Sequence, residues 1–219
     1  MKQLIMKDIR LVGIKNLFVL GAAILWGTIA IFVDNAFISN YFYGLGMFGS
    51  YFFISNAIYT GELSAKSDAL IISLPVKKFD IVKSRYLAMI IYIFSTLFIM
   101  YLTSTIAKTL FSNSLGNSLS LMGVFIIAAI MIIFISIHIP FKYYDHKSSQ
   151  FLLGIMFFLV ASSGRIIERL GIDIENSSLI NTLLTMNFET IGIIFLGIAL
   201  ILYSLSLFVS KGIYEAKEF

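Results

Sequence analysis

The chain has 219 residues, of which 59% are hydrophobic and 13% charged, and its mean hydropathy is +0.94. Soluble domains are typically about 45–50% apolar and about 25% charged, so the composition predicts an integral membrane protein and excludes an ordinary soluble domain. The formal net charge of +4 does not indicate nucleic-acid binding, because the basic residues lie between apolar runs, where membrane orientation accounts for them.

The first 16 residues are predicted to form an amphipathic helix that lies in the membrane interface. Ile5, Ile9 and Val12 recur at i, i+4 and i+7, while Lys7 and Arg10 lie on another face. Such a helix can place its basic groups on anionic lipid headgroups. The alternative is a solvated positive segment that only sets the membrane topology. No small-residue cleavage signature follows, so we expect no removable signal peptide.

Six apolar stretches follow and predict an all-α membrane protein with six transmembrane helices in a single domain, 1–219. The predicted spans are about 17–33, 41–60, 86–107, 119–141, 148–164 and 190–210. The first and fifth are near the short end of the roughly 17–25 residues that cross a bilayer. In the second, Gly44, Gly46 and Gly49 would allow close helix approach, although glycine is also simply common in membrane helices.

Residues 62–85 connect the second and third spans and hold eight charged side chains. They also contain an apolar run, 69–74, which a merely solvated connection would not need. Ser67 or Asp68 can cap a short helix over this run, and Pro75 would end it. The sequence therefore predicts a cytoplasmic coupling helix that a partner receives.

A second helix is expected to begin just after the proline and to continue into the third span, with Phe79, Val82 and Tyr86 on one face. The two helices would form a bent element on the membrane surface. Its predicted apolar tip consists of Leu74, Val76 and Phe79, and its basic rim of Lys77 and Lys78.

The basic residues predict the orientation. With six spans, 13 of the 16 lysines and arginines fall on one side: four before the first span, five in the second connection, two in the fourth and two in the tail. The other side has only Lys108, Arg165 and Arg169. By the positive-inside rule, both termini and the 62–85 loop are expected in the cytoplasm of a multi-pass cell-membrane protein.

The loop sequence resembles a known family. Residues 68–87, D-A-L-I-I-S-L-P-V-K-K-F-D-I-V-K-S-R-Y-L, resemble the cytoplasmic loop of ABC-2 type transporter permeases, whose phrase is S-L-P-V followed by I-V-x-S-(K/R)-Y-L. Residues 139–144, I-P-F-K-Y-Y, with Lys147 after them, are similar to the end of span four in small bacterial members. The chain also resembles permease subunits of peptide exporters, such as phenol-soluble-modulin and bacteriocin-type systems.

The resemblance implies a division of labour. Two cytoplasmic ATP-binding subunits would bind ATP and Mg²⁺, and a second permease, the same or a related chain, would complete the pathway in a dimer. The cargo would be an amphipathic peptide or a lipid-like molecule, exported by alternating access. This chain has no G-x-x-x-x-G-K-[ST] phosphate loop, so we expect it to be a transporter subunit with no cofactor of its own and no enzymatic activity.

Two groups of site residues are predicted. The ATPase-coupling group consists of Glu62, Leu74, Pro75, Val76, Lys77, Lys78 and Phe79. The candidate gate or interface group consists of His138, Pro140 and Lys142. As alternatives, Glu62 would only pair with Lys66 at i+4, and His138 would be an ordinary interfacial polar residue. No catalytic or metal-binding set is predicted, because the two histidines lack a ligand spacing with carboxylates and cysteine is absent.

Two other classes of protein remain as alternatives. A membrane immunity or accessory protein that binds a toxic peptide would work without an ATPase. An ion-driven transporter is disfavoured, because the middles of the spans lack the buried acidic or basic relays that ion coupling requires.

Overall fold

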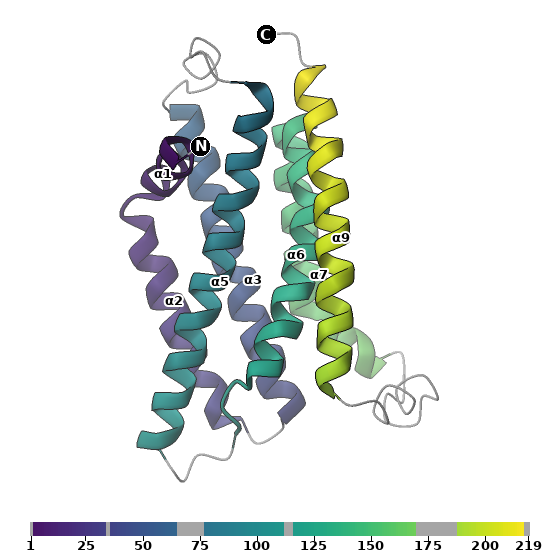
Figure 1. Ribbon diagram of the computed structural model, residues 1–219. Coiled ribbons are helices and arrows are strands. Elements are labelled where there is room, and N and C mark those ends of the chain that lie inside the picture. Colours follow the sequence, from purple (N-terminus) through teal and green to yellow (C-terminus); the bar gives the residue numbers. More distant parts are fainter. Residues whose placement is uncertain (1, 34–35, 65–76, 112–115, 170–187, 217–219) are drawn as a thin grey trace.

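A computed structural model of the chain describes residues 2–33, 36–64, 77–111, 116–169 and 188–216 (Figure 1). Every regular element in these residues is a helix, which confirms the predicted all-α class. The elements are α1 (Lys2–Val12), α2 (Lys15–Ile29), the short 3-10 helix η1 (Ala30–Phe32), α3 (Ala36–Ser64), α5 (Lys78–Leu110), α6 (Leu121–Tyr144), α7 (His146–Arg169) and α9 (Phe188–Glu215).

The long helices α2, α3, α5, α6, α7 and α9 run side by side as a bundle, and α1 lies across one end of it (Figure 1). The same end holds the last turn of α3, the start of α5, the turn between α6 and α7 and the last turn of α9. We call it the α1 end. Helix α6 packs most extensively against α9, and α1 contacts both α3 and α5.

Four helical segments within the described residues are long and apolar enough to cross a bilayer: Lys15–Phe32, Lys78–Leu110, Leu121–Tyr144 and Gly192–Glu215. Helix α7 contributes a shorter apolar segment, Lys147–Leu159. Helix α3 is not among the four, because its glycines, serines, asparagines and tyrosines lower its hydropathy. All six predicted stretches are helical, but the count of six spans stays a prediction.

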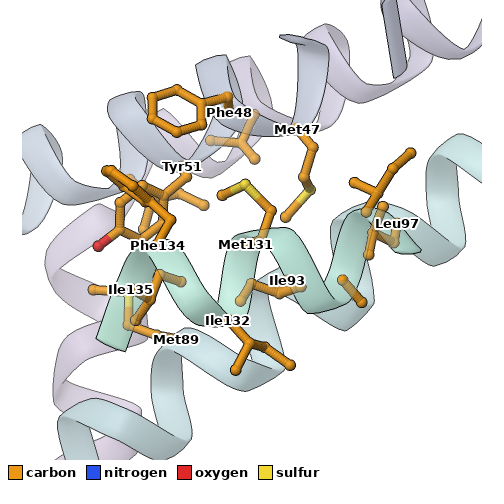
Figure 2. Packing of buried hydrophobic residues seen from close by; sticks show 14 of the residues in the cluster. Met47, Phe48, Tyr51, Met89, Ile93, Leu97, Met131, Ile132, Phe134 and Ile135 are labelled. Atoms are coloured by element: carbon orange, nitrogen blue, oxygen red, sulfur yellow. The ribbon is translucent and has the colours of Figure 1, made fainter. Parts of the chain in front are cut away.

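The bundle is held together by large apolar side chains from three central helices. Figure 2 shows Met47, Phe48 and Tyr51 of α3 facing residues of α5 and α6. The rings of Phe48 and Phe134 lie 4.5 Å apart between centroids. The outward faces are also apolar, as expected where lipid is the solvent; the exposed side chains there include Phe18, Leu25, Phe94, Phe98, Phe151, Phe158, Ile201 and Phe208.

One of the three glycines predicted to allow close packing does so. A Cβ atom on Gly46 would lie 2.5 Å from the Cβ of Trp26, so α2 and α3 approach closely only because that position has no side chain. Gly44 and Gly49 have nothing within 4 Å of the corresponding point. The prediction is therefore right for Gly46 and wrong for the other two.

Candidate functional site

The start of α5 contains three of the predicted coupling residues. Lys77 is the N-cap, with an extended backbone, and the helix begins at Lys78. Asp80 in the first turn complements the positive end of the helix dipole. Lys77 and Lys78 are exposed, and the Lys78 ammonium donates to the backbone carbonyl of Glu215 at 3.2 Å. The rim of α5 therefore touches the last turn of α9.

Four other predicted coupling residues cannot be placed. Leu74, Pro75 and Val76 lie outside the described residues, and Glu62 lies in the last turn of α3 but its side chain is outside them as well. Their roles stay predictions, as does the alternative pairing of Glu62 with Lys66.

Phe79 is half-buried between two cationic side chains. The Lys83 ammonium lies 4.7 Å from the centre of its ring, and the Lys211 ammonium of α9 lies 5.1 Å from it. Both distances suit a cation–π attraction. The predicted tip residue therefore also joins α5 to α9, and the basic rim extends to Lys83 and Lys211.

Arg85 forms a buried ion pair with Asp8. The Arg85 Nε lies 3.2 Å from Asp8 Oδ2, and the two side chains are only 8% and 2% exposed. Lys7 lies 3.6 Å from the other carboxylate oxygen. Sequence reasoning missed Asp8, although it continues the stripe of Ile5, Ile9 and Val12 at i+3 from Ile5. An acidic residue on the apolar face of a helix was the available signal.

A second polar contact joins the same two regions of the chain. The Tyr92 hydroxyl of α5 donates to the Asn16 side-chain oxygen at 3.1 Å, and the Asn16 amide donates to the Ile9 carbonyl at 3.3 Å. On the α3 side, the Lys15 ammonium donates to the Thr60 hydroxyl at 2.9 Å. The beginning of the chain is thus bound to both α5 and α3.

Tyr86 is the centre of a buried hydroxyl network. Its hydroxyl lies 2.6 Å from the Ser206 hydroxyl and 2.7 Å from the Ser210 hydroxyl of α9. The Tyr203 hydroxyl donates to the Tyr86 carbonyl at 2.6 Å, and Ser206 donates to the Ser136 carbonyl of α6 at 2.5 Å. The network therefore links α5, α9 and α6 with hydrogen bonds where water is excluded.

His138 lies between three helices. Its Nδ1 is 2.7 Å from the Tyr51 hydroxyl of α3, its Nε2 is 3.1 Å from the Ser149 hydroxyl of α7, and its ring stacks on Phe134. The side chain is 1% exposed, so His138 is enclosed by the bundle, and the alternative of an ordinary interfacial polar residue stays a prediction. Whether His138 gates a pathway stays a prediction.

Pro140 and Lys142 lie further along the same helix. Pro140 is inside α6, which continues to Tyr144 rather than ending at Phe141 as predicted. Proline lacks the N–H that would bond the carbonyl four residues earlier. That carbonyl belongs to Ser136 and accepts a hydrogen bond from the Ser206 hydroxyl instead. The helix therefore continues past Pro140 without leaving this carbonyl unbonded. Lys142 is buried, and its role at a gate stays a prediction.

These polar side chains share one level of the bundle. Each lies within about four turns of the α1 end, judged from its position in its helix and the 3.6 residues per turn. The arrangement suits the transfer of movement between helices. No cluster of three or more histidines and acidic residues able to hold a metal occurs in the part of the chain that the structure describes.

Comparison with known proteins gives one match. A family model described as "ABC-2 family transporter protein" matches residues 3–215, nearly the whole chain. No curated protein and no solved structure matches the chain.

Proposed function

This chain belongs to the ABC-2 transporter family, and on that premise we propose that it is the permease subunit of an ATP-binding-cassette exporter. Two separate cytoplasmic subunits bind and hydrolyse ATP, and this chain forms one half of the membrane pathway. The other half is a second permease, the same or a related chain. The cargo is amphipathic, with a peptide favoured over a lipid-like molecule.

The observation that carries the proposal is the continuity of α5. The helix has 33 residues and therefore extends about 50 Å, from the exposed Lys78 to Leu110. Its first turn projects the two lysines of the basic rim, and its remainder packs against α2, α6 and α9. A partner that binds the first turn of α5 therefore moves this long, rigid helix within the bundle.

The proposed orientation places the α1 end in the cytoplasm, with α2 and η1 together, α3, α5, α6, α7 and α9 as six spans. Its support is the distribution of charge among the described residues. The cations at the α1 end are Lys7, Arg10, Lys15, Lys77, Lys78, Lys83, Arg85, Lys142, Lys147 and Lys211. At the opposite end, Lys108 donates to the Gly116 carbonyl, and the last turns of α7 contain Arg165 and Arg169. This asymmetry follows the positive-inside rule.

In the proposed cycle, closure of the ATPase subunits displaces residues 74–79, and α5 follows. Because Tyr86 bonds Ser206 and Ser210, α9 moves with α5, and the Ser206–Ser136 bond extends the movement to α6. The cavity between two permeases then changes from inward-open to outward-open by rigid-body gating. No chemistry on this chain is needed.

An outward face that lines the proposed cavity between two permeases, instead of contacting lipid, suits an amphipathic cargo. Phe94, Phe98 and Leu102 form an exposed apolar stripe on α5, with the hydroxyls of Ser95 and Thr105 beside it. A peptide with one apolar face suits such a surface, whereas a charged solute would find no compensating charge along it.

The test is co-purification of an ATPase with variants of this chain from gently solubilised membranes. The triple variant Leu74→Ala, Pro75→Ala, Phe79→Ala removes two side chains of the apolar tip and the proline between them. The matched control Leu110→Ala, Phe111→Ala removes exposed apolar side chains at the opposite end. We expect the control to retain the ATPase and the triple variant to lose it. Unchanged co-purification with the triple variant would contradict the coupling assignment, and no ATPase with the wild type would favour the immunity or accessory protein.

A further inference from the structure

Two polar contacts fasten the beginning of the chain to one face of α5. We call residues 2–16, which comprise α1, the turn after it and the first two residues of α2, the elbow. Asp8 pairs with Arg85, and Asn16 accepts from Tyr92. Arg85 and Tyr92 are seven residues apart, which is almost two helical turns, so they lie on the same face about 10 Å apart along the axis. The elbow is therefore held at two points.

The shape of the elbow is itself fixed. Gly13 has a φ of +52°, a left-handed conformation that glycine adopts without strain and that lies in the bend between α1 and α2. The Asn16 amide closes the turn by donating to the Ile9 carbonyl. The same side chain thus bonds α1 through its nitrogen and α5 through its oxygen. Asn16 was not among the residues predicted from the sequence.

The elbow also reaches the helix on the other side of residues 65–76. Lys15 donates to Thr60, and the Leu11 side chain lies against Gly61 in the last turns of α3. The two helices that flank the predicted coupling segment are therefore connected through the elbow. Because α2 continues from the elbow, a displacement of α5 has a direct route to α2.

The ion pair restricts how the elbow can move. Apolar packing alone lets a helix slide or rotate, because one apolar contact replaces another at little cost. Separation of Asp8 from Arg85 would break a charge pair at a buried place where water does not replace the lost contact, and the contact of Asp8 with Lys7 is longer, at 3.6 Å. Buried pairs of this kind add little net stability compared with apolar residues of similar size. Their effect here is to fix one position of α1 on α5.

We propose that Asp8 and Asn16 are positioning residues, which make the elbow and the first turns of α5 a single rigid body. The part of the inference that concerns transport rests on the proposed function: movement of the start of α5 is passed through the elbow to α2. Neither residue touches cargo or nucleotide in this account.

The rigid body is tested on the full chain in lipid nanodiscs. The chain has no cysteine, so two introduced cysteines give a unique pair of spin labels. Labels at Arg10 and Leu87, both exposed, report the distance between α1 and α5. The double variant Asp8→Leu, Arg85→Met removes both charges of the ion pair, so neither charge stays buried without the other. Asn16→Ala removes the second contact, the hydrogen bond from Tyr92. Glu215→Gln, in an exposed ion pair at the same end, is the control.

We expect a narrow distance distribution in the wild type and in Glu215→Gln. In the double variant and in Asn16→Ala the distribution should be at least about twofold wider, because one of the two anchors is gone. An unchanged width in both variants would overturn the inference. If the double variant does not fold, the width of the distance distribution in Asn16→Ala alone tests the inference, because this substitution removes only uncharged hydrogen bonds.

Transmission is tested on the complex purified with its ATPase, with and without Mg²⁺ and ATP. Labels at Phe18 and Phe151, exposed on α2 and α7, report the movement of α2 against a helix that the proposed cycle does not bond to α5. The wild-type shift on addition of ATP should fall by half or more in the double variant while the ATPase still co-purifies. A full shift in that variant would overturn the transmission role. If no ATPase co-purifies with the wild type, the proposed function is contradicted. The Arg10–Leu87 distances still test whether the elbow and the first turns of α5 form a single rigid body.

Discussion

Ser206 of α9 donates its hydroxyl to the Ser136 carbonyl of α6, the acceptor that Pro140 leaves without its helical partner. A proline in a buried helix removes one backbone hydrogen bond, and in a membrane the freed carbonyl must find another donor. The same serine hydroxyl lies 2.6 Å from that of Tyr86. The proline is thus connected to α5, the helix that begins beside the coupling segment.

Replacement of Ser206 by alanine should destabilise the bundle by about 1–3 kcal/mol, because the Ser136 carbonyl is left buried and unbonded. Ser204→Ala is the matched control, since Ser204 is exposed and bonds only the Leu200 carbonyl of its own helix. Unfolding by SDS in mixed micelles measures both. Equal free energies of unfolding for the two variants would show that the Ser206–Ser136 bond does not contribute.

Pro140→Ala should make Ser206 less important. Alanine supplies the missing N–H to the Ser136 carbonyl, so the hydroxyl of Ser206 is no longer its only donor. The cost of Ser206→Ala should therefore be smaller in the Pro140→Ala background, with an interaction free energy of about 0.5–3 kcal/mol. A double-mutant cycle with the same unfolding assay measures it. If the free-energy costs of Pro140→Ala and Ser206→Ala are strictly additive, the connection between Pro140 and Ser206 is contradicted.

Gly46→Ala should destabilise the contact between α2 and α3 by about 1–3 kcal/mol, because the new methyl group would overlap Trp26. Gly49→Ala, three residues along the same helix, meets nothing within 4 Å. It should be neutral or stabilising, since alanine has the higher helix propensity. Thermal unfolding followed by gel filtration compares the two, and an equal loss in both variants would contradict the packing described here.

Tyr51→Phe should lower the free energy of unfolding by about 1–3 kcal/mol, because the buried Nδ1 of His138 loses its hydroxyl partner while the ring packing is preserved. Tyr144→Phe removes a hydroxyl from an exposed tyrosine and serves as the control. The comparison again uses the free energy of unfolding in mixed micelles. If Tyr51→Phe is as stable as the control, His138 is satisfied without Tyr51.

Local patterns predicted the parts of this fold that depend on neighbouring residues. Phe79, Val82 and Tyr86 share a face at helical spacing, and α5 does begin at Lys78 and continue through them, with Val82 and Tyr86 buried. The fifth predicted span, 148–164, lies within α7, which extends further, to Arg169. The apolar runs predicted all six long helices because lipid and protein interior both select apolar side chains.

The polar contacts could not be predicted in this way, because they join residues far apart in sequence. Tyr86 and Ser206 are 120 positions apart, and each alone is an ordinary residue of a membrane helix. Of three similar glycines, only Gly46 faces Trp26, which depends on the rotation of α3. Asp8 was the exception, since an acidic side chain on an apolar stripe already required a buried cation.

The central claim is that the α1 end faces the cytosol, where an ATPase can reach the start of α5. Single cysteines at Lys77 and at Asn117, exposed near opposite ends of the bundle, test it in a chain without native cysteine. With a membrane-impermeant maleimide on intact cells, we predict labelling at 117 alone, with 77 labelled only after permeabilisation. Labelling of 77 in intact cells would invert the orientation and contradict the exporter account.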